Sequence, residues 1–377
     1  MNLRQPPGKG RAGIRVANGV AHFDIPFSVL DLAVVGSGST PGAALSGTIE
    51  LARRTEQLGY QRFWVAEHHN MPGIASSAPP VLIAHLAAAT RSMRVGSGGV
   101  MLPNHAPLVV AEQFGMLEAL HPGRIDLGIG RAPGTDPVTA QALRRTANAL
   151  SVDDFPEEFA ALVGYFSSAN DRGVHAVPAL GNKPDVWLLG SSGYSAQVAG
   201  MLGLPFAFAH HFSATNTLPA LALYREQFRP SARLTEPYAM VCASVVAARD
   251  DERARYLAGP GGLSFLQLRQ GRPGLMPTPA QAAGYDYNEM ERAFVADRFA
   301  NQIIGGPDTV FKGITSLLEQ TQADELMVTT MVHDPSDARR SHELVAELAE
   351  LSPPASRSSG DQAAYPSVAD PSGNDAA

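Results

Sequence analysis

The sequence is poor in cysteine, in long apolar runs and in basic charge, and each shortage excludes a class of protein. Among its 377 residues, Cys242 is the only cysteine, which excludes an intrachain disulfide and fits a reducing compartment. No apolar run approaches the roughly 20 residues that span a bilayer, so we expect no membrane segment. The formal net charge of −7 argues against nucleic acid as the main partner, because phosphate backbones require a basic face.

Three common cofactor and nucleophile motifs are also missing. The nearest approach to a Gly-x-Gly-x-x-Gly dinucleotide fingerprint is at 128–133, where Pro133 and the absent third glycine spoil the pattern. No Gly-x-Ser-x-Gly elbow and no Walker loop is present. Cys242 lies in the apolar run 239–246, which indicates a small buried side chain rather than a nucleophile. The sequence therefore has no convincing nicotinamide site of its own.

The two ends of the chain differ in composition from its middle. Residues 1–25 carry several basic side chains but no apolar signal region, and we expect them to form a mostly disordered extension without a secretory signal. Residues 352–377 are rich in Pro, Ser, Gly, Asp and Ala and are expected to be a disordered tail. The remaining 26–351 are expected to form one cytoplasmic domain with a full core, because 45% of the chain is hydrophobic.

Eight short segments are almost continuously apolar or β-branched, which is typical of strands buried on both faces of a parallel sheet. They are 27–34, 62–66, 93–98, 125–129, 186–189, 206–209, 239–247 and 325–329. Most are followed by an amphipathic helical pattern, and this alternation indicates a parallel sheet covered by helices. Eight such units favour an α/β fold of the (β/α)8 TIM-barrel type over an open doubly wound sheet.

The helical segments can be predicted in more detail. Residues 43–59 form a helix that stops at Gly59 and has one apolar face, comprising Leu45, Ile49, Ala52, Thr55 and Leu58. Residues 107–120 begin with proline and have an inward face comprising Val110, Phe114, Leu117 and Leu120. The stretches 132–184, after the fourth strand, and 248–324, between the seventh and eighth, exceed simple connections and are expected to be insertions.

Functional groups of a (β/α)8 barrel lie where the strands end and the next loops begin. Glu67, His68 and His69 follow the second strand, and His210 and His211 follow the sixth. Histidine and carboxylate are common metal ligands, but adjacent residues of an extended strand point to opposite faces, so His68 and His69 cannot easily share one ion. We therefore expect no protein-bound metal. Glu67 belongs either to a rim network or to the functional site, for which His68 is the better candidate.

An arginine at the end of the fourth strand is not easily explained by packing, because arginine seldom enters a barrel core unpaired. Arg131 ends the segment 124–131 and is suited to a phosphate. The alternative is an ion pair with Asp126 or Asp136.

Small polar residues at the end of the fifth strand open a predicted helix at 193–202. Ser191 and Ser192 there combine hydroxyls with a helix N-terminus, an arrangement suited to an anion. The alternative is simple N-capping by serine. Two glycines, Gly98 and Gly99, end the third strand, where glycine is unfavourable unless something approaches the backbone closely. A flat ring lying over this strand end would explain them, and an ordinary bulge is the alternative.

Several of these motifs together resemble the bacterial luciferase-like monooxygenase family, in particular its single-chain luciferase-like class oxidoreductases. The segments that carry the resemblance are 64–69, 94–103, 111–114, 122–131 and 190–196. The likeness runs in the same order from about residue 27 to residue 350. It implies a (β/α)8 barrel that binds FMN or, in sister groups, the deazaflavin F420.

The resemblance also implies roles for particular residues. Positions that hold the flavin phosphate in the family are matched by Arg131, Ser191, Ser192, Tyr194 and Ser195. The Gly98–Gly99 pair matches a strand bulge against which the isoalloxazine packs, often with a non-prolyl cis peptide. His68 matches the histidine that faces the reactive edge of the flavin. Glu67 and His211 are further candidates for the catalytic site.

Two positions depart from the light-emitting members of the family. The reactive cysteine of bacterial luciferase is replaced by Gly130, and a glutamate of its phosphate loop is replaced by Ser191. These differences argue against light emission, and they prevent any inheritance of substrate preference.

The resemblance implies a flavin-dependent monooxygenase. Reduced FMN, supplied by a separate NAD(P)H:flavin reductase, would react with O2 to give a C4a-peroxyflavin that oxygenates a small organic substrate. We also expect a homodimer. Two alternatives remain at this point: an F420-dependent hydride-transfer oxidoreductase on the same barrel, and a flavin-binding protein without turnover.

Overall fold

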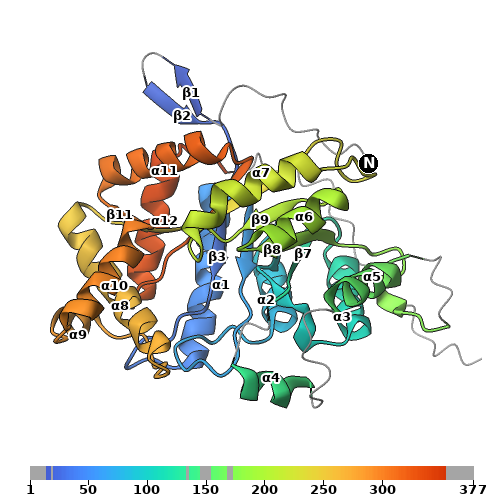
Figure 1. Cartoon of the computed structure of the whole chain (residues 1–377), viewed down its shortest axis with the longest axis horizontal. Coiled ribbons are helices and arrows are strands. Elements are labelled where there is room, and N and C mark those ends of the chain that lie inside the picture. Colours follow the sequence, from blue (N-terminus) through green and yellow to red (C-terminus); the bar gives the residue numbers. More distant parts are fainter. Residues whose placement is uncertain (1–13, 18–19, 133–135, 145–153, 168–172, 354–377) are drawn as a thin grey trace, which may run out of the picture.

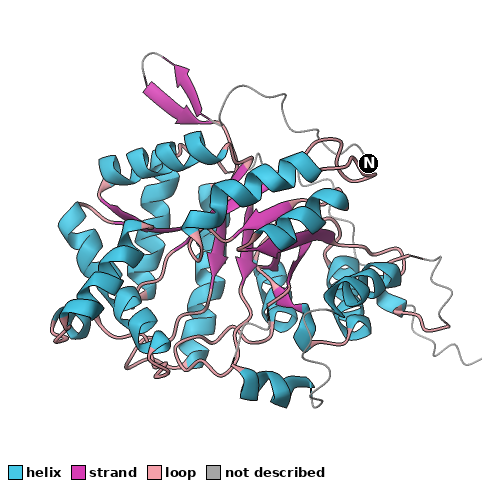
Figure 2. Cartoon of the chain, in the orientation of Figure 1, coloured by secondary structure: helices cyan, strands magenta, loops and turns pink. Residues whose placement is uncertain are grey.

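The centre of the molecule is a closed barrel of eight parallel strands (Figures 1 and 2). The computed structural model describes residues 14–17, 20–132, 136–144, 154–167 and 173–353. Within them, the barrel strands in chain order are β3 (Phe27–Asp31), β4 (Arg62–Val65), β5 (Arg94–Ser97), β7 (Ile125–Gly130), β8 (Asp185–Gly190), β9 (Phe206–Phe208), β10 (Ala239–Ala247) and β12 (Glu325–Thr329). Pairing of β12 with β3 closes the circle, which confirms the predicted (β/α)8 barrel.

Helices follow the strands and form the outer layer, seen in cyan in Figure 2. They are α1 (Pro41–Leu58), α2 (Pro79–Ala89), α3 (Pro107–Leu120), α5 (Phe155–Tyr165), α6 (Gly193–Met201), α7 (Thr217–Gln227), α11 (Pro307–Thr321) and α12 (Pro335–Leu348). The predicted stop of α1 is confirmed, because Gly59 adopts a left-handed conformation with φ of 96°. The predicted inward face of α3 is correct for Val110, Phe114 and Leu117, but Leu120 is 51% exposed.

The two long connections hold additional elements, as predicted. The first contains α4 (Pro137–Arg144), α5 and the 3-10 turn η5 (Val177–Ala179). The second contains α8 (Asp251–Arg269), α9 (Pro279–Ala283), α10 (Glu289–Ala300) and the short strand β11 (Ile303–Gly305), which pairs with β10. Three further short elements are β6 (Val100–Met101), η2 (Leu102–Asn104) and η6 (Ala214–Asn216).

The N-terminal extension is more ordered than predicted. Strands β1 (Ile14–Ala17) and β2 (Val20–Phe23) form an antiparallel hairpin, so the expectation of disorder over 1–25 is wrong for these residues. The hairpin is attached by the ring of Phe23, which lies 5.6 Å from that of Phe27 and 5.1 Å from that of Phe311. Aromatic contacts of this kind order a short hairpin that could not stand alone. Residues 1–13 and 354–377, for which disorder was also predicted, lie outside the described residues.

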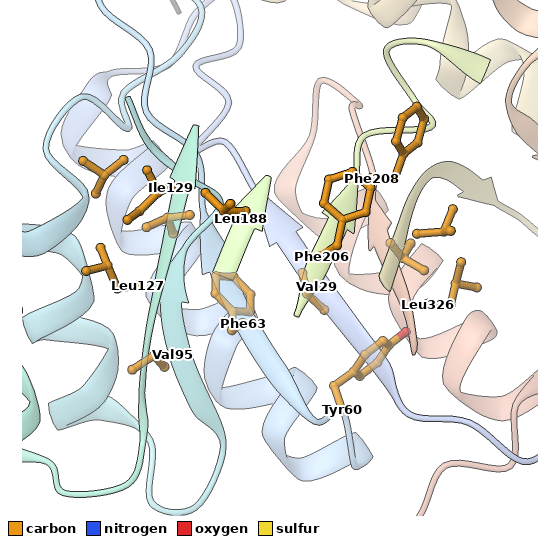
Figure 3. Close-up of a cluster of buried hydrophobic side chains, with 14 of the residues drawn as sticks. Val29, Tyr60, Phe63, Val95, Leu127, Ile129, Leu188, Phe206, Phe208 and Leu326 are labelled. Atoms are coloured by element: carbon orange, nitrogen blue, oxygen red, sulfur yellow. The ribbon is translucent and has the colours of Figure 1, made fainter. Parts of the chain in front are cut away.

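Alternate residues of each strand point to opposite sides of the barrel wall. Val29, Phe63, Val95, Leu127 and Leu326 pack outward into the large cluster beneath the helices (Figure 3). A smaller cluster fills the barrel interior and comprises Leu30, Trp64, Ala66, Trp187, Ala207, Met240, Cys242 and Met327. Cys242 is 5% exposed, and burial raises the pKa of its thiol, which agrees with its interpretation as a small core residue.

A buried ion network closes the N-terminal end of the barrel below this interior cluster. The Arg62 guanidinium donates to Glu325 at 2.7 Å and to Asp126 at 2.8 Å. Arg94 donates to the other oxygen of Asp126, and the indole of Trp64 donates to Asp126 at 2.9 Å.

Within the part of the chain that the structure describes, no helix is long and apolar enough to cross a bilayer.

One buried histidine outside the barrel is expected to make stability depend on pH. His342 of α12 is 1% exposed, its Nδ1 has no hydrogen-bond partner, and burial lowers its pKa to about 4. The unfolded chain therefore binds this proton first as the pH falls. We expect the free energy of unfolding to drop by about 3 kcal/mol between pH 7 and pH 4 on account of His342.

This drop should be absent in His342→Leu, measured by guanidinium unfolding at both pH values. The hydroxyl of Tyr60 donates to the backbone carbonyl of residue 342, so the substitution keeps that bond. The matched control is His85→Leu, because His85 is exposed on α2. An unchanged pH dependence in His342→Leu would contradict the assignment.

Candidate functional site

The predicted site residues all follow barrel strands at the same end of the barrel. Glu67 and His68 follow β4, and the glycine pair follows β5. Arg131 follows β7, Ser191 and its neighbours follow β8, and His211 follows β9. Because all eight strands are parallel, these positions share one rim at their carboxyl ends.

Glu67 is the centre of a buried hydrogen-bond network. Its Oε1 accepts from His69 Nε2 at 2.9 Å and from His105 Nε2 at 2.8 Å, and its Oε2 accepts from the Met101 amide at 3.1 Å. Burial opposes ionisation of Glu67, but the bonds from His105 and His69 outweigh it and lower its pKa to about 2. Of the two interpretations left open, these contacts match the rim network, and they fasten the segment after β5 to the end of β4.

The same three side chains are the one group of potential metal ligands found among the described residues, with ligand atoms within 4.8 Å of one another. The two distances to Glu67 are hydrogen-bond lengths, whereas tetrahedral coordination with bonds near 2.1 Å would hold ligands about 3.4 Å apart. Hydrogen bonding therefore accounts for the cluster. The sequence places His105 directly after η2, but its pairing with a residue 38 positions earlier could not be read from spacing.

His68 faces the barrel side of the rim. It has the same parity as Trp64 and Ala66, which both belong to the interior cluster. Its backbone amide donates to Ser76 at 3.0 Å, while its Nδ1 is buried without a hydrogen-bond partner. Burial lowers the pKa of His68, so the ring is neutral at pH 7. A buried polar atom without a partner is unusual and is suited to a ligand group.

His211 lies near His68, because the charge of His68 contributes to the electrostatics of His211. Burial lowers the pKa of His211 to about 4, and its Nδ1 lies 3.1 Å from the carbonyl of Cys242. Its neighbour His210 instead bonds Thr217 at 2.8 Å. The structure thus brings two predicted catalytic residues, His68 and His211, to one side of the rim as neutral imidazoles.

The two glycines after β5 form an irregular junction. Their peptide bond is cis, as the resemblance implied, and they separate β5 from β6. A Cβ at Gly99 would lie 2.8 Å from the carbonyl oxygen of Gly128, and one at Gly98 would lie 2.7 Å from Leu30. Close approach of neighbouring protein atoms therefore excludes side chains here. A side chain at position 99 would have to displace the backbone of β7.

Arg131 and Tyr194 meet across the gap between β7 and β8. The guanidinium carbon lies 4.2 Å from the centre of the tyrosine ring, a cation–π contact. The alternative ion pairs are not formed, because Asp126 bonds Arg62 and Arg94, and Asp136 bonds Thr139 and Asn70. Among the described residues, Arg131 has no carboxylate partner.

The N-terminus of α6 lies beside this arginine. Ser192 is the N-cap residue, but its side chain makes no capping hydrogen bond. Ser191 and Ser192 are exposed, whereas Ser195 is buried beside Gly190. The first amides of α6, the free serine hydroxyls and the Arg131 guanidinium are therefore all available to an anion at one place.

Comparison with known proteins places this geometry in a family. A profile described as luciferase-like monooxygenase matches residues 25–325. The chain is 50% identical to YvbT of Bacillus subtilis (strain 168), over 86% of this chain and 97% of that protein. It is 48% identical to a luciferase-like monooxygenase of Escherichia coli (strain K12), with the same coverage. N-acetyl-S-alkylcysteine monooxygenase of Bacillus subtilis is 32% identical, over 86% and 98%.

Solved structures show the same barrel. The crystal structure of apo-MsnO8 superimposes with a TM-score of 0.81 and 37% identity, over 88% of this chain and 100% of that chain. The oxygenating constituent of 3,6-diketocamphane monooxygenase from Pseudomonas putida, in complex with FMN, has a TM-score of 0.65 and 20% identity, over 87% and 98%. An F420-dependent secondary alcohol dehydrogenase has a TM-score of 0.59 and 14% identity, over 86% and 99%.

The two more distant likenesses show the fold alone, but they indicate that this barrel holds either a flavin or F420 in different proteins. The profile match and the relatives cover most of the chain and carry the family assignment. The chain therefore belongs to the luciferase-like monooxygenase family and is an oxygenating oxidoreductase.

Proposed function

We propose that the protein is an FMN-dependent monooxygenase that uses reduced FMN and O2 to oxygenate a small organic substrate. The observation that carries the proposal is the meeting of Arg131 and Tyr194 beside the uncapped N-terminus of α6. A guanidinium that pairs with no carboxylate of the described residues suits a terminal phosphate, together with free hydroxyls and helix amides. The phosphate-binding residues are Arg131, Ser191, Ser192, Tyr194 and Ser195.

FMN rather than F420 is the proposed cofactor. The relatives that cover most of the chain at 32% identity or more include three named as monooxygenases, whereas the F420-dependent neighbour is only 14% identical. Anaerobic titrations with reduced FMN and reduced F420, followed by ultraviolet–visible absorbance, separate these cofactors. Tighter binding of F420 would favour the alternative hydride-transfer function.

Reduced FMN would supply the two electrons that activate O2 when it is bound. The balanced reaction is RH + O2 + FMNH2 → ROH + H2O + FMN, so one oxygen atom enters the substrate and the other leaves as water. In this proposal the flat ring packs against the Gly98–Gly99 junction, and Glu67 holds the segment after that junction through the Met101 amide. His68 and His211, both neutral at pH 7, would hold and move protons at the reacting edge.

Two partner proteins follow from the proposal. A separate NAD(P)H:flavin reductase would supply the reduced flavin, because the sequence offers no convincing nicotinamide site. A second copy of the chain would form a homodimer through the neighbouring helices α2 and α3, which expose four large apolar side chains. These are Val81, Val109, Met116 and Leu120.

Oxygen consumption provides the direct test of this function. The protein with a flavin reductase, NADH and FMN should consume O2 in proportion to substrate oxidised, with little release of H2O2. The substrate panel should include an N-acetyl-S-alkylcysteine, for which one relative is named. If no panel member lowers H2O2 release below the flavin-only background, a flavin-binding role without turnover is favoured.

The phosphate site makes a quantitative prediction. Arg131→Ala should weaken FMN binding by about 1.5–3 kcal/mol, because it removes a charge-assisted contact to the phosphate. Calorimetric or fluorescence titration with FMN measures this change. Arg229→Ala is the matched control, because Arg229 is exposed beyond the opposite end of α6. Equal dissociation constants for Arg131→Ala and the unmodified protein would remove Arg131 from the cofactor site.

A further inference from the structure

Arg298 of α10 is a half-buried cation that meets no anionic side chain in the part of the protein that the structure describes. Its Nε is shielded from solvent and has no hydrogen-bond partner, and its side chain forms no ion pair within the described residues. Arg54, Arg62, Arg94, Arg233 and Arg253 instead contact carboxylates. Desolvating a guanidinium without a compensating anion is unfavourable, so its position calls for a ligand.

The guanidinium is held in a defined orientation by aromatic rings. Its central carbon lies 3.7 Å from the centre of the Phe265 ring, which belongs to α8. Phe265 in turn stacks on Phe294, with ring centres 5.7 Å apart and planes within 6°. A planar fork fixed against an aromatic face loses little entropy when it binds a planar, bidentate anion.

Arg298 also lies over the rim that carries the proposed catalytic residues. Gly261 of α8 faces the second residue after the end of β12, since a Cβ there would lie 3.1 Å from the carbonyl oxygen of Met331. Phe265 is one helical turn further along the same face. The charge of Arg298 contributes to the low pKa of His211, so the guanidinium lies within electrostatic reach of that imidazole.

The loop between α8 and α9 is fastened to the same rim. The Met276 amide donates to the Val35 carbonyl at 2.9 Å, and the Ser37 amide donates to the Met276 carbonyl at 2.8 Å. These bonds join the 248–324 insertion to the loop after β3. The insertion therefore brings a cation to the side of the rim where His68 and His211 are neutral at pH 7.

We propose that Arg298 binds a carboxylate of the substrate and so makes this enzyme selective for carboxylic acids. The inference rests on the proposed function, because it concerns the substrate of the same site. A single guanidinium beside neutral histidines balances one negative charge, which suits a carboxylate better than a phosphate dianion. Burial lowers the pKa of Arg298 to about 10, which leaves it charged at pH 7.

Paired ligands test this proposal without any turnover. Butanoate, hexanoate, octanoate and benzoate are each compared with the corresponding neutral amide, and affinity is obtained from the dependence of Tm on ligand concentration. For the full-length protein we expect at least one carboxylate to bind about tenfold or more tightly than its amide. Arg298→Met should abolish that difference.

The matched control is Arg292→Met. Arg292 is exposed on the same helix and lines a separate cavity of about 300 Å³ between α8, α9 and α10. This variant should keep the preference for the carboxylate. Without ligand, Arg298→Met should unfold at the same or a higher Tm than the unmodified protein, because it removes a poorly compensated cation.

Three results would overturn the proposal. One is the absence of any carboxylate preference in the unmodified protein, and another is its persistence in Arg298→Met. The third is a marked loss of Tm in Arg298→Met, which would make the arginine structural. Titration of the same proteins with FMN separates the two proposals. Failure to bind FMN would contradict the proposed function, whereas the affinities for carboxylate and amide can still be compared.

Discussion

His68→Ala is expected to lower substrate oxygenation by about a hundredfold or more while leaving FMN affinity within about tenfold. The imidazole is neutral at pH 7, faces the barrel side of the rim and has a buried Nδ1 without a partner. It is therefore suited to hold a proton beside the reacting oxygen, and loss of a proton-transfer group costs about 10²–10⁴ in rate. A single lost hydrogen bond to the cofactor changes its binding by only about 1 kcal/mol.

The measurement combines FMN titration with the ratio of H2O2 released to O2 consumed. Stopped-flow mixing of the reduced-FMN complex with O2 should show faster loss of H2O2 from His68→Ala. The matched control is His121→Ala, because His121 ends α3 shortly before the start of β7 and so lies at the opposite end of the barrel. If His68→Ala leaves the ratio of H2O2 released to O2 consumed unchanged, His68 has a structural role only. The catalytic assignment would then move to His211 or His210.

Arg62→Met is expected to destabilise the fold by about 3–5 kcal/mol. The substitution keeps much of the side-chain volume but leaves Asp126 and Glu325, both fully buried, without the cation between them. Breaking a buried ion pair from one side costs this much because a charge remains uncompensated in a low-dielectric interior. Denaturant unfolding at pH 7 measures the change.

Two further variants show whether uncompensated charge is the cause. Adding Glu325→Gln to Arg62→Met should restore part of the lost stability, because it removes the carboxylate that loses its cation, whereas Asp126 still pairs with Arg94. Arg54→Met, which breaks a more exposed pair with Glu343, should cost about 1 kcal/mol or less. If Arg62→Met loses no more stability than Arg54→Met, Arg94 alone compensates the buried carboxylates at the N-terminal end of the barrel.

The strands were the most predictable part of the fold. All eight predicted segments overlap barrel strands, since a strand buried on both faces is almost continuously apolar. The end of α1 at Gly59 was also predicted correctly, because a residue that ends a helix in the left-handed conformation is usually glycine. Leu120 was misjudged because helical periodicity predicts an apolar face but not whether other protein covers its last turn.

The candidate site was predictable only to the level of strand ends. The order of the strands and the positions at their ends predict that Arg131, Ser191 and His68 share one rim. They did not predict that Arg131 would stack on Tyr194 instead of pairing with Asp126 or Asp136. Such choices depend on competing partners, and Arg62 and Arg94 already occupy Asp126.

The sequence by itself determined the barrel, its rim and the family to which the chain belongs, because these follow from local pattern and short motifs. Only the tertiary structure decided that Glu67 pairs with His105 and that Arg298 lies near His211. Both arrangements join residues far apart in the chain through loops and an insertion. Periodicity describes which face of an element is buried, whereas the neighbour that a side chain meets is decided by how the elements pack.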